Sequence, residues 1–206
     1  MEGQLREVVR RLVVDSLAAP VPSLTRRDVH LPNVRGKATA VIGMRRTGKT
    51  CLLWQILADR LAAGTPREGL LFFGFEDERL AAMTASDLQL VIEEYYRLHP
   101  EWREGRRAVL FLDEIQTVPG WEAFARRLLD SERIELFLSG SPARLLSREI
   151  VTSMRGRALE ALVQPFSFRE FLRHRGEEPR KEPRRWTSAE RSLIEKRFRE
   201  YLVEGG

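Results

Sequence analysis

Apolar residues occur along the chain in two kinds of pattern. Short, nearly continuous apolar runs are typical of strands covered on both faces of a sheet, and they lie at residues 38–42, 70–75, 108–112, 135–138 and 158–163. Longer segments carry apolar residues every three or four positions, which predicts amphipathic helices over residues 4–19, 51–63, 86–98 and 144–154 and from residue 121 onward. Because strands and helices alternate, we expect an α/β fold with a mostly parallel five-stranded sheet and right-handed crossovers.

The two ends of the chain carry helical patterns outside this alternation. The helix over residues 4–19 either packs on the main domain or binds a partner, and a proline-punctuated linker follows from Pro20 to Pro32. Near the C-terminus, two capping boxes predict short helices over residues 168–174 and from residue 187 to about 203. We therefore divide the chain into an N-terminal helix and linker, a core and a C-terminal helical extension, at residues 1–30, 31–165 and 166–206.

Composition limits the classes to which the protein can belong. Its 206 residues, 43% of them apolar, suit one α/β domain with a small appendage. No apolar run is long enough to span a membrane and the N-terminus lacks a signal-peptide core, so we expect a cytoplasmic protein without membrane contact. The single cysteine excludes an internal disulfide and a cysteine-rich zinc site. The net charge of +5 comes from an arginine-rich composition, so it supports nucleic-acid binding only weakly.

The first chemical signature follows the first buried strand. Residues 43–50, GMRRTGKT, match the phosphate-binding loop pattern G-x-x-x-x-G-K-[ST], in which glycines let backbone N–H groups face the phosphates. Lys49 places a cation on the β- and γ-phosphates, the Thr50 hydroxyl ligates Mg²⁺, and the helix that follows adds the positive end of its dipole. We expect the whole loop to bind a nucleoside triphosphate, through Gly43, Met44, Arg45, Arg46, Thr47, Gly48, Lys49, Thr50 and Cys51.

Two further residues bear on the identity of the nucleotide and on the chemistry near the loop. Guanine-specific GTPases read their base with an N-K-x-D element, which cannot be built here because the only asparagine is Asn33. We therefore expect ATP as the nucleotide. Cys51 lies one residue beyond the loop, where it is either a buried packing residue, the interpretation we favour, or a reactive thiol.

The second chemical signature is a pair of acids at the end of the third strand. Asp113 follows the apolar run AVLFL and can hold the Mg²⁺ bound to Thr50, directly or through water. The adjacent Glu114 is the carboxylate that a hydrolase needs to orient and polarise the attacking water, whereas a phosphotransferase has little use for it. Gln116 either contacts the γ-phosphate or caps a turn. The pair therefore favours hydrolysis.

The strand over residues 135–138 decides between two sheet topologies. It ends in Ser139-Gly140-Ser141, and in one topology such a polar-tipped strand is inserted between the phosphate-loop strand and the aspartate strand. Together with Glu114, it favours that topology, with strand order 5-1-4-3-2. One of the two serines would then lie beside Glu114. Arg157 precedes the last strand, where it is either an arginine finger for a neighbouring subunit's nucleotide or an ordinary surface residue.

Five separated motifs resemble those of a family of bacterial and archaeal AAA+-type ATPases: GMRRTGKT, FEDERL, LFLDEIQTVPGWEAFARRL, LSGSPARLLSREIVTSMRGR and PFSFREFL. The resemblance implies an AAA+-like P-loop NTPase three-layer sandwich with ATP and Mg²⁺ as ligands. It matches Gly43, Gly48, Lys49 and Thr50 to the Walker A element, Asp113 and Glu114 to Walker B, Ser139 to a position near sensor 1, and Arg157 to a G-R pair. Family members continue into a C-terminal domain of uncertain role, so we expect the extension over residues 166–206 to be cut short.

Three functions follow from these observations. The first is a Mg²⁺-dependent ATPase in which Lys49 and Glu114 act on the phosphates and the water, with hydrolysis driving a conformational change in a partner or a missing domain. The second is a nucleotide-dependent switch with little turnover. The third, prompted by the basic charge, is DNA-coupled work. An arginine finger at Arg157 would also require a homo-oligomer.

Overall fold

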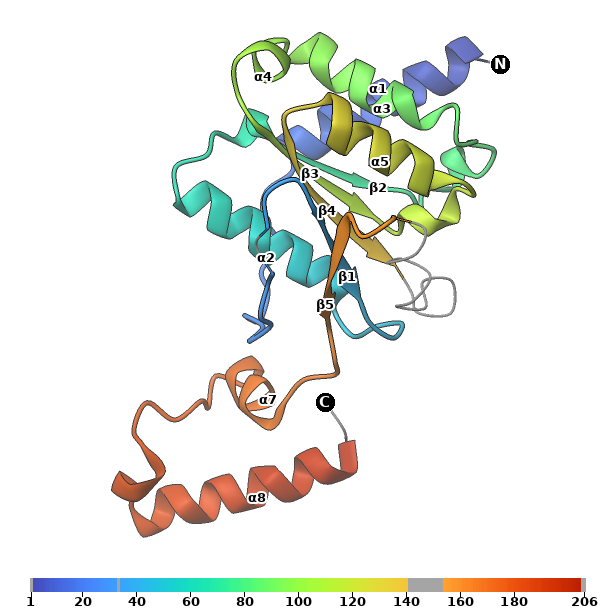
Figure 1. The fold of residues 1–206 in the computed structure, drawn as a ribbon. Coiled ribbons are helices and arrows are strands. Elements are labelled where there is room, and N and C mark those ends of the chain that lie inside the picture. The colour runs from blue at the N-terminus through green and yellow to red at the C-terminus, as the bar shows by residue number, and fades with distance from the viewer. Residues whose placement is uncertain (1, 33, 141–153, 205–206) are drawn as a thin grey trace.

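The computed structural model describes residues 2–32, 34–140 and 154–204. Its sheet has the order β2-β3-β4-β1-β5, and every pair of neighbouring strands is parallel (Figure 1). The predicted order 5-1-4-3-2 is therefore confirmed. The strands are β1 (Ala38–Ile42), β2 (Leu70–Gly74), β3 (Ala108–Asp113), β4 (Ile134–Gly140) and β5 (Ala158–Leu162). The helices are α1 (Glu2–Ala18), α2 (Lys49–Ala62), α3 (Leu88–Leu98), α4 (Glu101–Glu104), α5 (Trp121–Ser131), α7 (Phe168–His174) and α8 (Ser188–Glu204).

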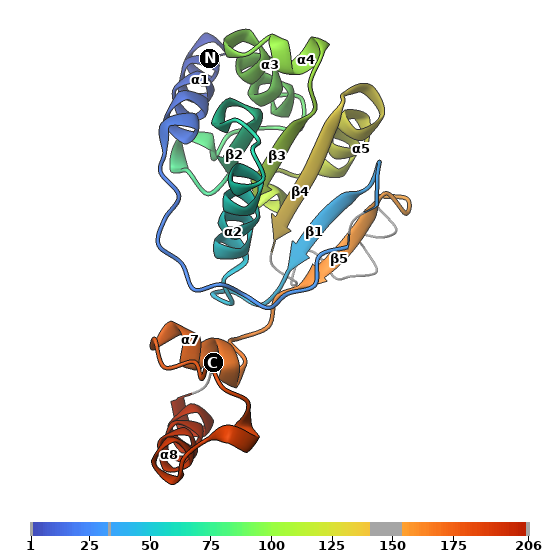
Figure 2. The same cartoon turned by 90° about the vertical axis from the view of Figure 1, so that its left-hand side faces the viewer.

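Helices cover both faces of the sheet and give three layers. Successive strand residues point to opposite faces, so each strand supplies two separate cores. On one face α2 packs over a core that includes Val41, Phe72 and Val109. On the other face α1, α3 and α5 pack over a core that includes Ala40 and Leu110 (Figure 2). The predicted AAA+-like three-layer sandwich is confirmed.

A row of aromatic rings fixes three strands in register beneath α2. Phe72 pairs with Phe111, and Phe111 pairs with Phe137, in the parallel ladders of β2, β3 and β4. The ring centroids lie 6.3 Å and 5.1 Å apart, and Trp54 of α2 stacks on Phe72 at 4.3 Å. Because a slip of one residue would turn each ring to the other face, this row specifies the register that carries the strand ends.

Helix α1 packs on the main domain, which was one of its two predicted roles. It lies against α3 and β2, and its Val9 and Val13 side chains are fully buried. Arg6 donates hydrogen bonds to Glu93 and to the fully buried Glu94 of α3, at 2.9 and 2.8 Å. This ion pair offsets the cost of burying the Glu94 carboxylate.

Helices α7 and α8 lie beyond the edge of the sheet at which the strands end, and the linker between α1 and β1 passes between them and the core (Figures 1 and 2). A capping box of Ser167 and Glu170 begins α7, as predicted. Phe168 of α7 packs edge-on against Phe198 of α8 at 5.1 Å, and Tyr201 lies 5.5 Å from the Phe168 ring. The contact between these two helices is therefore mainly aromatic.

Two predicted features fall on residues that the structure does not describe. The helix expected over residues 144–154 lies almost wholly outside the described residues, and Ser141 lies outside them too. Helices within the described ranges are all too short or too polar to cross a membrane.

Candidate functional site

The phosphate-loop pattern lies at the carboxyl end of β1, where the chain turns into α2. Gly43 packs so closely that a Cβ atom there would lie 2.3 Å from the Val163 carbonyl oxygen. Gly48 has φ +92°, and Arg46 also has a positive φ of 66°. Glycine adopts such backbone angles without strain, so the turn requires glycine at position 48, whereas Gly43 is required by its close packing on Val163.

Lys49 occupies the inner side of this loop. Its side chain is only 5% exposed, and Nζ donates a hydrogen bond to the Met44 carbonyl oxygen at 3.2 Å. The same Nζ lies 3.4 Å from Oε1 of Glu114. The structure thus brings the predicted phosphate-binding lysine and the predicted catalytic glutamate together across the sheet edge.

Asp113 lies at the carboxyl end of β3, between two hydroxyl groups. Thr50 donates a hydrogen bond to its Oδ2 at 2.9 Å, and Ser139 donates to its Oδ1. Burial raises the pKa of the Asp113 carboxyl and the nearby Glu114 carboxylate raises it further, whereas the two hydroxyl hydrogen bonds lower it. A buried carboxylate with adjacent oxygen donors is therefore a position at which a cation would be stabilised.

Mg²⁺ fits this donor set. It prefers oxygen ligands, and Asp113 and Thr50 supply a carboxylate and a hydroxyl in contact with each other. Within the described ranges, no group of three or more His, Cys, Asp or Glu side chains forms a metal site. A magnesium ion at Asp113 would therefore need further oxygens from phosphates and water, which is its usual mode of binding beside nucleotides.

Glu114 is held in a special backbone conformation. Its φ is +54°, its N–H donates to Ser139 Oγ at 2.9 Å, and Gln116 Nε2 donates to its Oε2. A non-glycine residue with positive φ is uncommon, and such residues concentrate at functional sites. Gln116 thus has a role that neither of its predicted ones described, because its amide holds the Glu114 carboxylate.

Ser139 contacts both acids, because β4 is the neighbour of β3 in the sheet. It is 1% exposed and bonds to both Asp113 and the Glu114 backbone. The structure therefore brings Ser139 into the site, while Ser141 lies outside the described residues.

Arg157 does not join this cluster. Its carbonyl oxygen accepts from Ala38 N at 2.8 Å at the start of β1, and its guanidinium pairs with Asp130 at the end of α5. It therefore lies at the amino edge of the parallel sheet, opposite the phosphate loop. Action on a neighbouring subunit's nucleotide stays a prediction.

Cys51 corrects one expectation. The favoured role was buried packing, but the Cys51 side chain is exposed. It lies in the first turn of α2, where the helix face away from the sheet meets solvent, whereas Leu52 and Leu53 provide the buried contacts. Met44 of the loop is also exposed, at 68%.

Arg27 is a residue of this region that sequence reasoning missed. Its Nη1 donates to the Thr47 carbonyl oxygen of the phosphate loop at 2.6 Å, and the residue is only 4% exposed. It lies in the linker, where no periodic pattern or motif marks it, and its partner is 20 positions away in the sequence. The sequence offered no signal for it beyond an arginine in an arginine-rich chain.

A cavity of about 690 Å³ adjoins Arg27 at the same edge of the sheet. Its walls come from the linker, the end of β5 and the segment after it, α7 and α8, and they include Val29, His30, Gln164, Phe166, Glu170 and Tyr201. This volume lies in the range of small-molecule sites. The phosphate loop and the cavity are connected through Arg27, which contacts the loop and lines the cavity.

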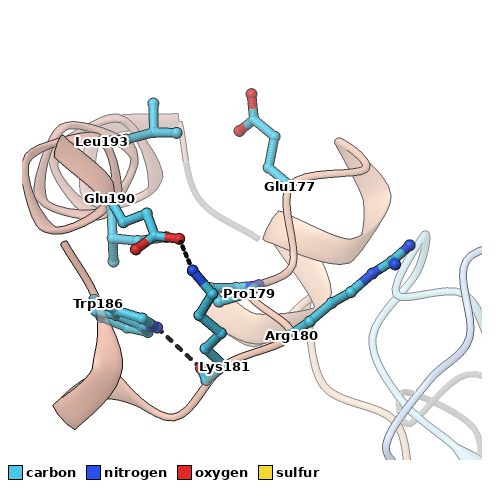
Figure 3. A pocket seen from close by; sticks show the side chains of 8 residues that line it. Glu177, Pro179, Arg180, Lys181, Trp186, Glu190 and Leu193 are labelled. Atoms are coloured by element: carbon cyan, nitrogen blue, oxygen red, sulfur yellow. Dashed lines mark hydrogen bonds and ion pairs between the residues drawn. The ribbon is translucent and has the colours of Figure 1, made fainter.

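A second cavity, of about 320 Å³, lies within the C-terminal helices (Figure 3). Trp186 forms one wall, and its Nε1 donates to the Lys181 carbonyl oxygen at 2.9 Å. Lys181 in turn pairs with Glu190 of α8 at 3.0 Å. Its lining contains none of the predicted site residues.

Two uncharacterized proteins are similar to this chain in sequence. The chain is 32% identical over 196 residues to the uncharacterized protein MJ1544 of Methanocaldococcus jannaschii, covering 95% of this chain and 41% of that protein. It is 32% identical over 167 residues to an uncharacterized protein of Haemophilus influenzae, covering 81% of this chain and 38% of that protein. The chain thus spans about two fifths of the length of these relatives.

Solved structures with a distant likeness include Cdc6p from Pyrobaculum aerophilum and AMPPCP-bound DnaA from Aquifex aeolicus. The first is 18% identical with a TM-score of 0.46, and the match covers 86% of this chain and 48% of that one. The second is 16% identical with a TM-score of 0.42, covering 97% and 60%. The profile of the AAA domain family matches residues 35–172, and the chain belongs to that family.

Proposed function

We propose that this protein binds ATP with Mg²⁺ and hydrolyses it to ADP and phosphate. The observation that carries the proposal is the meeting of Lys49, Asp113 and Glu114 at one sheet edge beside a glycine-rich loop. Thr50 and Asp113 are 63 positions apart in the sequence, yet their side chains are hydrogen-bonded. Positioning and charge stabilisation are what phosphoryl transfer to water requires of a protein.

Each residue has a defined part in this proposal. Lys49 and the loop N–H groups bind the phosphates, and Thr50 and Asp113 hold Mg²⁺, which neutralises charge on the phosphate oxygens. Glu114 orients the attacking water and accepts its proton. Ser139 holds the Glu114 backbone and the Asp113 carboxylate in place.

The cavity beside Arg27 would take the base and ribose of the nucleotide. It opens at the edge of the sheet where β1 ends, and the residues Val29 and Phe166 give it apolar surface. Binding there would place the triphosphate toward Thr47 and the loop. The base pocket would then be formed partly by the linker and partly by α8.

One observation favours a second candidate function, a nucleotide-dependent switch with little turnover. Both carboxylate oxygens of Glu114 are engaged, Oε1 by Lys49 and Oε2 by Gln116. In this arrangement Lys49 and Gln116 hold the Glu114 carboxylate. An incoming γ-phosphate would replace Glu114 as the anionic partner of Lys49, and turnover then depends on how readily Glu114 leaves Gln116.

Phosphate release from ATP and Mg²⁺ tests the proposal. We expect Glu114→Gln to bind ATP and to lower kcat roughly hundredfold or more, because general-base catalysis contributes about 10²–10⁴-fold. Lys49→Ala should lose both binding and turnover. Glu76→Gln is the matched control, since Glu76 is an exposed carboxylate that follows β2 at the same sheet edge. If the wild type binds ATP but turns over no faster than Glu114→Gln, hydrolysis is excluded and the switch remains.

The use made of the nucleotide is also a proposal. Because the relatives are more than twice as long as this chain, we propose that ATP acts on a partner or on a further domain through the C-terminal helices. The division of the chain at residues 30 and 165, the assembly that Arg157 would serve and any contact with DNA stay predictions.

A further inference from the structure

Arg27 connects three segments that are distant in sequence. Its Nη1 donates to the Thr47 carbonyl oxygen at 2.6 Å, and its Nη2 donates to the Gln164 carbonyl oxygen at 2.5 Å. Its Nε donates to Glu170 Oε1 of α7 at 2.9 Å. The guanidinium also lies over the Phe166 ring, 4.7 Å from its centroid. A planar group with five fixed donors is suited to hold several acceptors in one geometry.

The backbone of Arg27 is fixed to α2, the helix that begins at the phosphate loop. Its N–H donates to Gln55 Oε1 at 2.7 Å, and Gln55 Nε2 donates back to its carbonyl oxygen at 3.1 Å. Gln55 is buried, so this pair of bonds is shielded from water. Arg27 therefore belongs to the rigid core, and its guanidinium reaches outward to α7.

The bond to Thr47 determines how the phosphate loop presents its amides. In a trans peptide the C=O and the following N–H point in opposite directions. Because Arg27 holds the Thr47 carbonyl on the outer side, the Gly48 N–H points away from Arg27. A Cβ atom at Gly48 would lie 2.9 Å from Arg27 Nη1, so the guanidinium packs directly on the loop.

Glu170 determines how α7 sits on this guanidinium. Its Oε1 accepts from Asp28 N as well as from Arg27, and its Oε2 accepts from Ser167 N, both backbone bonds being 2.8 Å long. These bonds keep the pKa of Glu170 low, at about 2, so it is charged at neutral pH. Removing one partner of such a buried charge pair is costly, because the other charge is left buried and unpaired.

We propose that Arg27 is a positioning residue that couples the phosphate loop to the C-terminal helices, so that ATP binding and the placement of α7 and α8 depend on each other. The proposal rests on ATP binding at the loop. Nucleotide phosphates would fix the Thr47–Gly48 peptide, which fixes the guanidinium and, through Glu170 and Gln164, the start of α7. By linkage, a loss of the Glu170 contact should weaken ATP binding. Because Glu170 also lines the cavity proposed for the base and ribose, the exchange measurement on α7 is needed to separate coupling from direct contact.

The test compares ATP affinity among variants of the full 206-residue chain, with Mg²⁺ present, by calorimetric titration. We expect Arg27→Gln to weaken ATP binding about tenfold and Glu170→Gln to weaken it about five-fold, with the double variant close to Arg27→Gln alone, because coupled residues are not additive. Arg27→Lys, which keeps the charge but not the fork, should resemble Arg27→Gln. Arg27→Lys also provides the test if Arg27→Gln does not fold.

Two matched controls separate coupling from general loosening of the structure. Arg26→Gln removes a two-bond pair with Asp59 of α2 from the adjacent linker position. Arg173→Gln removes α7 contacts with Asp28 and the Arg26 carbonyl oxygen that do not touch the loop. Arg26→Gln should retain wild-type affinity for ATP, and Arg173→Gln should weaken it less than Arg27→Gln because its contacts do not reach the loop.

Hydrogen exchange of the α7 segment is a second measurement. If Arg27 only stabilised the fold, ATP would not change the exchange rate of α7. ATP should slow amide exchange over residues 168–174 in the wild type and in Arg26→Gln, but not in folded Arg27→Gln or Arg27→Lys. If these Arg27 variants keep wild-type affinity, or if ATP slows their α7 exchange as in the wild type, the coupling is overturned while ATP binding stands. If the wild type does not bind ATP, or binds it as well after Lys49→Ala, the proposed function itself fails and the coupling fails with it.

Discussion

The sheet and the C-terminal helices are stabilised in different ways. Strands β1 to β4 are buried almost completely, and side chains such as Phe111 have no exposed surface. Helix α8, in contrast, leaves Leu202 66% and Val203 87% exposed. Its contacts with α7 are a few aromatic pairs, and Arg197 adds an ion pair with Glu177.

This difference assigns different tasks to the two regions. Catalytic groups must be held within fractions of an ångström, which a close-packed sheet can do. The contacts of α7 with the rest of the chain include two ion pairs, Arg27 with Glu170 and Arg173 with Asp28. The Arg173–Asp28 pair is partly exposed and can be exchanged for water at modest cost, whereas the Arg27–Glu170 pair is buried and costly to break. The C-terminal helices are therefore suited to move about the Arg27–Glu170 contact, and the sheet is suited to hold the site still.

The largest effect should come from a cavity in the sheet. Phe111→Ala removes a ring that stacks on Phe137 at 5.1 Å beneath α2. We expect it to lower the free energy of unfolding by about 3–5 kcal/mol, as large-to-small changes in close-packed cores do. Urea unfolding followed by circular dichroism measures this loss.

Phe198→Ala is the counterpart in α8. Its ring is 44% exposed, so we expect a loss of about 1 kcal/mol. Equal losses for Phe111→Ala and Phe198→Ala would contradict the contrast between a rigid sheet and weakly attached helices.

Acid is expected to weaken the junction of the two regions. The folded-state pKa of Glu170 is lowered from 4.5 to about 2, by backbone hydrogen bonds to Asp28 and Ser167 and by Arg27, which together outweigh burial. A lowered pKa stabilises the folded state above the unfolded value, and that stability is lost as the pH falls through the folded value. The contribution of Glu170 should therefore be complete above about pH 5 and decline between pH 4.5 and about 2.

Glu170→Gln checks this sign. The difference in unfolding free energy between wild type and variant should be largest near neutral pH and should shrink in acid, as measured by urea unfolding at several pH values. A difference that stays constant down to about pH 3 would mean that the Glu170 charge does not stabilise the junction. Glu178→Gln is a useful comparison, because Glu178 pairs with Arg169 and Arg173 of α7 and does not contact the core.

The sequence predicted the sheet better than it predicted the junction. Strand order followed from local signals, namely the buried apolar runs, the acids at Asp113 and Glu114, and the polar end of the strand at Ser139. Each of these lies at the point where it acts. Glu170 was also recognised, but only as part of a capping box.

The role of Arg27 could not be predicted in the same way. Its partners lie 20, 137 and 143 positions away, so only the folded chain brings them together. For Arg157, the sequence predicted the position along the chain but not the position in space. Its place before the last strand was predicted correctly, but the parallel sheet puts that place at the edge away from the phosphate loop.

The smallest expected effect concerns Cys51, the only thiol of the chain. It is exposed in the first turn of α2, next to Thr50, so a label there reports on the phosphate edge. Cys51→Ser should change the free energy of unfolding by no more than about 0.5 kcal/mol, as exposed substitutions do. ATP with Mg²⁺ should slow maleimide labelling of Cys51 a few-fold in the wild type, because a bound nucleotide covers this turn. Lys49→Ala should abolish that protection. Labelling that does not respond to ATP in the wild type would place the nucleotide away from this loop.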